Sequence, residues 1–153
     1  MISLKNLVLS ILIPNVVGFI GNLFGNSSSN FDNIPKPNFT PPAFVFPIVW
    51  IILFTLMGIS SYIIFSSDSK NKTKALIIYG IQLVLNSLWS FFFFNLNWYL
   101  FSFIWILIIL FFVLLMIYEF YKINKCAALI QIPYVLWLIF AAIINYNVYL
   151  LAK

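Results

Sequence analysis

The third long apolar stretch of the chain carries polar side chains at a regular spacing. In IQLVLNSLWSFFFF, Gln82, Asn86 and Ser90 recur every four residues, and Trp89 follows Asn86 by three positions. In a helix these positions share one face. An amide in an apolar medium needs a hydrogen-bond partner, so this face either holds neighbouring helices together or lines a pocket that recognises a ligand. The spacing leaves both interpretations open.

The last apolar stretch shows the same pattern. Tyr134, Trp137, Ala141 and Asn145 fall at i, i+3, i+7 and i+11, which again places them on one helix face. The small side chain of Ala141 lets another backbone or a flat ligand approach closely. Trp137 lies within an apolar run, as Trp50 and Trp89 do, and a buried indole N–H needs an acceptor. A neighbouring carbonyl would satisfy it.

The residue types that are missing exclude several kinds of chemistry. The chain has no histidine and a single cysteine, Cys126. A histidine-ligated haem, a Ser-His-Asp triad and an internal disulfide are therefore excluded. The three acids, Asp32, Asp68 and Glu119, lie near the ends of the apolar runs, so no buried carboxylate pair is available for proton coupling. We predict no metal site, no required cofactor and no conventional catalytic residues.

Composition defines the elements that must position these residues. The chain is 64% hydrophobic and 7% charged, whereas soluble domains carry about 25% charged residues. A membrane-spanning helix needs roughly 20 apolar residues, and five continuously apolar runs meet this length. They cover residues 4–24, 44–67, 75–94, 99–121 and 126–151. We predict an all-α integral membrane protein, with residues 1–153 forming a single bundle of five transmembrane helices.

The lysines predict an orientation in the bilayer. All eight basic residues are lysine, and the net charge is +5. With five spans, six lysines fall on the side of the N-terminus and two on the other. The six are Lys5, Lys70, Lys72, Lys74, Lys122 and Lys125, and the two are Lys36 and Lys153. This bias predicts a cytoplasmic N-terminus. No basic stripe is interleaved with exposed aromatics, so nucleic-acid binding is not expected.

The second apolar run is preceded by the proline-rich stretch KPNFTPPAFVFPIVW, residues 36–50. We expect Thr40 to cap the helix, with Pro41 or Pro42 at early positions where a missing N–H costs little. Pro47 would still lie near the first turns. The stiffness of this segment predicts that residues 25–43 form a lid over the bundle and that Trp50 is held at a fixed depth.

Three motifs in this order resemble those of the TspO/MBR family, the tryptophan-rich sensory proteins of bacteria and the mitochondrial translocator protein, also called the peripheral benzodiazepine receptor. The first is KP-x-F-TPP from Lys36, which leads into FPIVW and LFTLMG. The second is the LN-x-x-W-S-x-x-FF run from Leu85, and the third is PY-x-x-W from Pro133. The resemblance covers the whole chain.

The resemblance implies a function beyond what the residues alone predict. Members of the family are five-helix bundles, often homodimeric, with a pocket that accepts porphyrins, sterols and synthetic isoquinoline carboxamides. This implies a membrane binding protein for planar hydrophobic ligands, above all protoporphyrin IX, with a role in tetrapyrrole or stress regulation. The ligand-binding positions carried over are Phe31, Pro41, Trp50, Phe54, Asn86, Trp89, Ser90, Trp137 and Ala141.

The chain departs from the family pattern at three aromatic positions. Phe39 stands where the family has a tryptophan, Phe54 where it has a tyrosine, and Phe31 where some members have a tyrosine. Each change removes a hydrogen-bond donor.

Three alternative functions stay open. The first is light- and oxygen-dependent porphyrin breakdown, with Trp50 and Trp137 as oxidisable neighbours. The others are translocation of porphyrin or another lipophilic ligand, and a purely structural membrane subunit. The lysine-rich, arginine-free composition is typical of an AT-rich bacterial genome, which predicts a bacterial cell membrane as the location.

Overall fold

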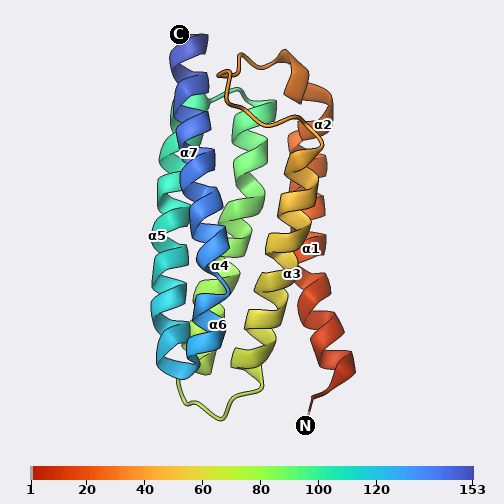
Figure 1. Ribbon diagram of the computed structural model, residues 1–153, viewed down its shortest axis with the longest axis vertical. Helices are drawn as coiled ribbons and strands as arrows, with labels where there is room; N and C mark the ends of the chain where they lie inside the picture. The colour runs from red at the N-terminus through yellow and green to blue at the C-terminus, as the bar shows by residue number, and fades with distance from the viewer. Residues whose placement is uncertain (1) are drawn as a thin grey trace.

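The computed structural model describes residues 2–153, apart from the side chains of residues 27 and 28. In this part of the chain, the structure is all helical and elongated, with the helices side by side (Figure 1). The long helices are α1 (Leu4–Gly25), α3 (Val45–Phe65), α4 (Lys72–Ser90), α5 (Tyr99–Ile123) and α7 (Ile132–Ala152). The short elements are α2 (Ser27–Asn30), η1 (Phe31–Asn33), η2 (Phe91–Asn95) and α6 (Lys125–Leu129).

Five helical segments in the described residues are long and apolar enough to cross a membrane. They are Leu4–Gly25, Val45–Phe65, Lys72–Asn95, Tyr99–Ile123 and Lys125–Ala152. The prediction of an all-α membrane protein with five transmembrane helices is confirmed. The odd number of crossings places the N-terminus and C-terminus at opposite ends of the bundle (Figure 1).

The fifth span is two helices where the sequence predicts one. Asn124 caps α6 by accepting a hydrogen bond from the backbone N–H of Ala127, 3.0 Å away. The chain then turns at residues 130–131 before α7 starts with Pro133 in its first turn. The pyrrolidine ring removes a backbone donor and tends to break a continuing helix, so the interruption coincides with Pro133.

The third span also departs from a regular helix at its end. After Ser90 the backbone continues as the π-helix η2, which holds four successive phenylalanines and Asn95. A π-helical turn is often found at a functional site. The Phe93 ring stacks on the Trp89 ring, with the centroids 4.8 Å apart.

The helix α1 is positioned by glycines at its contacts with α3 and α4. A Cβ on Gly58 of α3 would lie 2.6 Å from the carbonyl oxygen of Ser10. A Cβ on Gly21 of α1 would lie 2.7 Å from the carbonyl oxygen of Ser87 in α4. Both distances are far below van der Waals contact, so the close approach of these backbones depends on the absence of a side chain.

The first loop crosses one end of the bundle before it enters α3 (Figure 1). Our expectation that Thr40 caps this helix, with Pro41 or Pro42 at an early helical position, is wrong. The helix starts at Val45, whose N–H donates to the carbonyl of Pro42 at 3.0 Å, and no side chain within residues 2–153 caps it. Pro47 is the third helical residue, where the backbone N–H would have no partner in the helix anyway.

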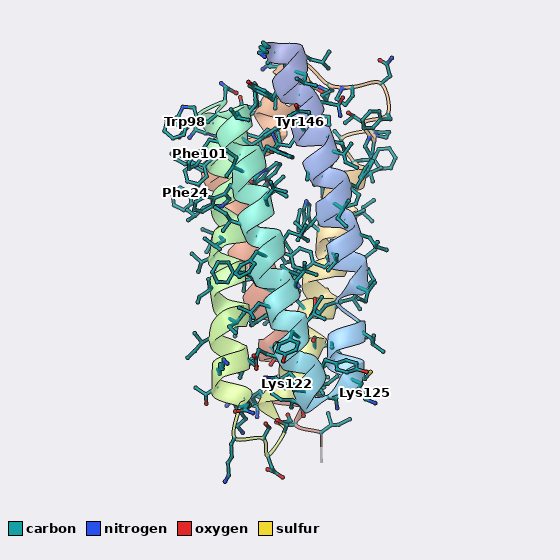
Figure 2. The ribbon with its side chains drawn as sticks, turned by 90° about the vertical axis from the view of Figure 1, so that its left-hand side faces the viewer. Phe24, Trp98, Phe101, Lys122, Lys125 and Tyr146 are labelled. Atoms are coloured by element: carbon teal, nitrogen blue, oxygen red, sulfur yellow. The ribbon has the colours of Figure 1, made fainter. Side chains whose placement is uncertain are left out.

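The two ends of the bundle differ in their side chains. Lys122 and Lys125 lie toward one end, and Trp98, Phe101 and Tyr146 lie toward the other (Figure 2). At the lysine-rich end, the buried carboxylate of Glu119 pairs with Lys122 at 3.0 Å and with Lys74 at 3.4 Å. The pair with Lys74 joins α4 to α5, whereas the pair with Lys122 lies within α5.

Candidate ligand pocket

A cavity of about 490 Å³ opens inside the bundle at the end covered by the first loop. Its walls come from α1, α3, α4, η2, α7 and the loop itself. The described residues that line it are Asn15, Gly18, Phe19, Gly21, Asn22, Phe31, Ile34, Lys36, Thr40, Ala43, Phe44, Phe46, Pro47, Trp50, Ile51, Phe54, Asn86, Ser87, Trp89, Ser90, Phe93, Phe94, Trp137, Ala141, Ile144, Asn145 and Val148. The volume falls within the range of roughly 300–1,000 Å³ that is usual for small-molecule sites.

The structure brings eight of the nine predicted binding residues to this cavity. They are Phe31, Trp50, Phe54, Asn86, Trp89, Ser90, Trp137 and Ala141. The ninth, Pro41, is half-buried and is not among the lining residues, whereas its neighbour Thr40 is. The position of these residues is thus a property of the fold, and their contact with a ligand stays a prediction.

Aromatic rings form much of the wall. The Trp50 ring stacks on Phe54 with centroids 5.3 Å apart, and it meets the Trp137 ring edge-on at 6.4 Å and 90°. Phe46 extends this wall, since its ring lies 5.7 Å from that of Trp137. Phe31 lies 5.3 Å from Phe46 and brings the loop into contact with α3. The wall therefore offers broad apolar faces at fixed angles.

Some of the polar groups that line the cavity are already paired. The indole N–H of Trp89 donates to Oδ1 of Asn145 at 3.1 Å. The side-chain amide of Asn145 in turn donates to the backbone carbonyl of Tyr99 at 2.8 Å. These bonds tie α4 and α5 to α7. Trp89 and Asn145 therefore hold helices together and also line the cavity, so the two interpretations of their spacing do not exclude each other.

A second chain of hydrogen bonds forms the floor of the cavity. The side-chain amide of Asn86 donates to the hydroxyl of Tyr134 at 2.7 Å, and this hydroxyl donates to Oε1 of Gln82 at 2.8 Å. Tyr134 and Gln82 are almost fully buried. Because each partner satisfies the next, this buried chain fixes the side-chain rotamers beneath the pocket.

Two buried polar atoms in the cavity wall have no partner within the described residues. They are the indole Nε1 of Trp137 and the hydroxyl Oγ1 of Thr40. A buried donor without an acceptor costs about 1–3 kcal/mol. Neither atom has appreciable accessible surface, so its side chain must rotate before a ligand acceptor in the cavity can pair with it and recover this free energy. With such a rotation, these two atoms are candidates for polar contacts with a ligand.

Lys36 is the only charged side chain among the described residues that line the cavity. Its ammonium donates to the backbone carbonyls of Phe31 at 2.7 Å and Ile34 at 3.2 Å, and it lies 4.6 Å from the centroid of the Phe31 ring. An ammonium has three donors, so one N–H remains for an anionic ligand group. Lys36 also holds the loop in its folded shape.

The cavity wall also includes residues of α1 that are not among the predicted binding positions. Asn15, Gly18 and Asn22 recur at i, i+3 and i+7, and such a stripe of small and polar residues is typical of close helix packing. The structure places all three in the wall, where Gly18 faces the ring of Phe54. The spacing of small residues was the available signal, but it does not distinguish a helix contact from a pocket wall.

A sequence profile of the TspO/MBR family matches residues 10–151. The chain belongs to the TspO/MBR family. It is similar to the tryptophan-rich protein TspO of Archaeoglobus fulgidus, with 35% identity over 97% of this chain and 98% of that protein. The TspO of Chlorobaculum tepidum is 32% identical over 95% of each chain. The translocator protein of Homo sapiens is 28% identical over 90% of this chain and 85% of the human protein.

Membership of the TspO/MBR family agrees with the architecture of five apolar helices. The chain is a multi-pass integral membrane protein. The names of its relatives describe them as tryptophan-rich sensory and translocator proteins.

Proposed function

We propose that this TspO/MBR protein binds flat hydrophobic ligands that carry carboxylates, with porphyrins such as protoporphyrin IX as the favoured class. The unpaired indole N–H of Trp137, a residue that lines a cavity walled by aromatic rings, carries this proposal. The ring faces of Trp50 and Phe54 suit a planar apolar ligand. Lys36 at the loop side of the cavity supplies a cation for a propionate.

Binding of protoporphyrin IX is expected to quench the tryptophan fluorescence of the wild-type protein in a saturable way. For the variants, the porphyrin absorbance change gives the dissociation constant independently of the protein's own fluorescence. Trp137→Phe should weaken binding, because it retains an aromatic ring and loses the N–H donor. One neutral hydrogen bond of about 0.5–1.5 kcal/mol corresponds to roughly two- to twelve-fold.

The matched control is Trp98→Phe, since Trp98 is 52% exposed and lies outside the cavity. This variant should bind like the wild type. Quenching that fails to saturate, or an equal loss of affinity in both variants, would contradict the assignment of Trp137.

A second candidate function is light- and oxygen-dependent breakdown of the bound porphyrin, and the perpendicular Trp50 and Trp137 rings favour it. In this reaction, both atoms of one oxygen molecule add across a carbon–carbon double bond of the macrocycle, and its cleavage leaves two carbonyls. No external reductant is required. Trp50 and Trp137 are the oxidisable side chains that would face the porphyrin macrocycle. A new product spectrum under light that disappears in Trp50→Phe would support it, whereas bleaching at the rate of free porphyrin in detergent would argue against it.

The orientation proposed for the TspO/MBR protein puts the lysine-rich end in the cytoplasm, as the charge bias predicts. Cys126 is exposed at this end and provides a native probe. A membrane-impermeant thiol reagent should label Cys126 in opened cells and leave it unlabelled in intact cells. Labelling in intact cells would reverse the orientation.

The proposed partner in the membrane is a second copy of the chain, which would contact α4. Gly80 lies on the outer face of this helix between exposed Ile77 and Val84, and a Cβ at Gly80 would meet nothing within 4 Å. Small residues on such a face let two helices approach closely. Gly80→Leu should therefore convert a dimer to a monomer when the mass is measured in mild detergent, and a wild-type monomer would overturn the proposal.

A further inference from the structure

Below the floor of the pocket, two fully or almost fully buried side chains present polar atoms without partners. Gln131 has no exposed surface, and neither Oε1 nor Nε2 of its side chain meets a hydrogen-bond partner within residues 2–153. The hydroxyl of Tyr79 also meets no partner at full hydrogen-bond geometry, although the Ser61 side chain lies beside it, and Tyr79 is 7% exposed. These three atoms are distinct from the groups that line the cavity.

The helix geometry places these side chains in the same layer of the bundle. The helices α4 and α7 run in the same direction, from the lysine-rich end toward the end with the first loop (Figure 1). Tyr134 of α7 and Gln82 of α4 are joined by a hydrogen bond of 2.8 Å. Gln131 and Tyr79 each precede these partners by three residues. Both therefore lie about one turn nearer the lysine-rich end, on the faces that already meet.

An amide and a phenol in the interior of a membrane bundle need partners. A polar group that is buried without a hydrogen bond is costly, and such groups in native proteins are commonly satisfied by internal water. A buried water typically makes about three hydrogen bonds to polar groups that would otherwise be unpaired. The phenol of Tyr79 and the two ends of the Gln131 amide match this requirement.

We propose that the bundle binds a cluster of water molecules between Gln131 and Tyr79, directly beneath the Asn86–Tyr134–Gln82 floor. The hydroxyl of Tyr134 has a second lone pair with which to accept a hydrogen bond from this cluster. The polar interior then continues from the pocket toward the lysine-rich end, although most of the surrounding side chains are apolar. The floor of the pocket separates a ligand site from a hydrated layer.

Radiolytic hydroxyl-radical labelling of the full-length protein in detergent, without ligand, tests the proposal. Radicals form from water, so a buried side chain is modified where water is bound beside it. Tyr79 should be modified in spite of its burial, and Gln131→Leu should reduce this modification several-fold. Exposed Tyr118 serves as the internal reference and should not change. A Tyr79 that is not modified, or that is modified equally in Gln131→Leu, would overturn the proposal.

The sign of a stability change provides a second and independent test. The test is made in the Ser61→Ala background, so that the neighbouring hydroxyl cannot supply the bond. If water satisfies the phenol, Tyr79→Phe removes hydrogen bonds and lowers the melting temperature. If the phenol is unsatisfied, the same change removes a penalty and raises the melting temperature. Tyr118→Phe at the exposed surface is the matched control and should leave it unchanged. An increase, or no change, in Tyr79→Phe would contradict bound water at this hydroxyl.

Discussion

The Gly58→Ala variant is expected to unfold at a melting temperature several degrees below that of the wild-type protein. The added methyl group would lie 2.6 Å from the carbonyl oxygen of Ser10 and 2.9 Å from the backbone nitrogen of Ile11. Both atoms belong to the backbone of α1, so no side-chain rotation can relieve the overlap. The helix α1 must move away from α3 as a unit.

The size of this effect follows from how α1 is held. The buried residues of α1 are Pro14, Gly21 and Gly25, so its packing depends on close backbone contacts with few large side chains. Overpacking a tight contact typically costs about 1–3 kcal/mol. For a protein of this size, 1 kcal/mol corresponds to roughly 2–4 °C in melting temperature. Thermal unfolding in detergent, followed by circular dichroism, measures the change.

Gly80→Ala is the matched control for the same chemical change. A Cβ at Gly80 would meet nothing within 4 Å, and alanine favours a helix over glycine by about 1 kcal/mol. Measured on the monomer, in detergent that dissociates the proposed dimer through α4, this variant should be as stable as the wild type or slightly more stable. If Gly58→Ala and Gly80→Ala shift the melting temperature alike, the contact between α1 and α3 is not as close as the structure places it.

The membrane spans and two helix faces that line the cavity could be predicted from local patterns. A run of 20 apolar residues identifies a spanning helix because the bilayer requires that length. The spacing of Gln82, Asn86 and Trp89 identifies one face of α4 because the helical period is a local property. The motif resemblance then placed Trp50 and Trp137 at the cavity, where the structure also has them.

Other features depend on contacts that no local pattern specifies. The π-helix η2 follows Ser90, and it contains no proline or glycine that would predict a change in the helix. The pocket contains Thr40 and not Pro41, because the path of the loop is set by its contacts with α3 and α7. Which indole N–H groups are hydrogen-bonded also depends on contacts between helices. Trp89 donates to Asn145, whereas Trp137 has no partner in the described chain. These outcomes required the helices to be placed against one another.

Lys36→Met is expected to weaken binding of protoporphyrin IX about tenfold more than it weakens binding of its dimethyl ester. The two ligands share the same flat macrocycle, but only the free acid carries propionates. Methionine keeps much of the length of the lysine stem and removes the charge. A hydrogen bond to a charged group contributes about 1.5–3 kcal/mol, and the partial exposure of Lys36 to solvent places the expected effect at the lower limit.

Comparing the free acid with the dimethyl ester distinguishes two roles of Lys36, which are recognition of the anionic propionate and support of the loop. Lys36 also donates to the carbonyls of Phe31 and Ile34, so its removal loosens the loop in either case. A loosened loop weakens the acid and the ester equally, whereas loss of an ion pair weakens only the acid. The difference between the two free energies isolates the charge. Lys153→Met, at the same end of the bundle and outside the cavity, should change neither.

The dependence of binding on salt concentration also distinguishes the two roles of Lys36, because this residue is half-exposed. An ion pair at the solvent-facing side of the pocket weakens as the ionic strength rises, so the preference of the wild type for the acid should decrease with salt. The Lys36→Met variant should show no such dependence. Equal loss for acid and ester, at all salt concentrations, would assign Lys36 to the loop alone. The propionates would then pair with the groups of Trp137 and Thr40 that have no partner in the described chain.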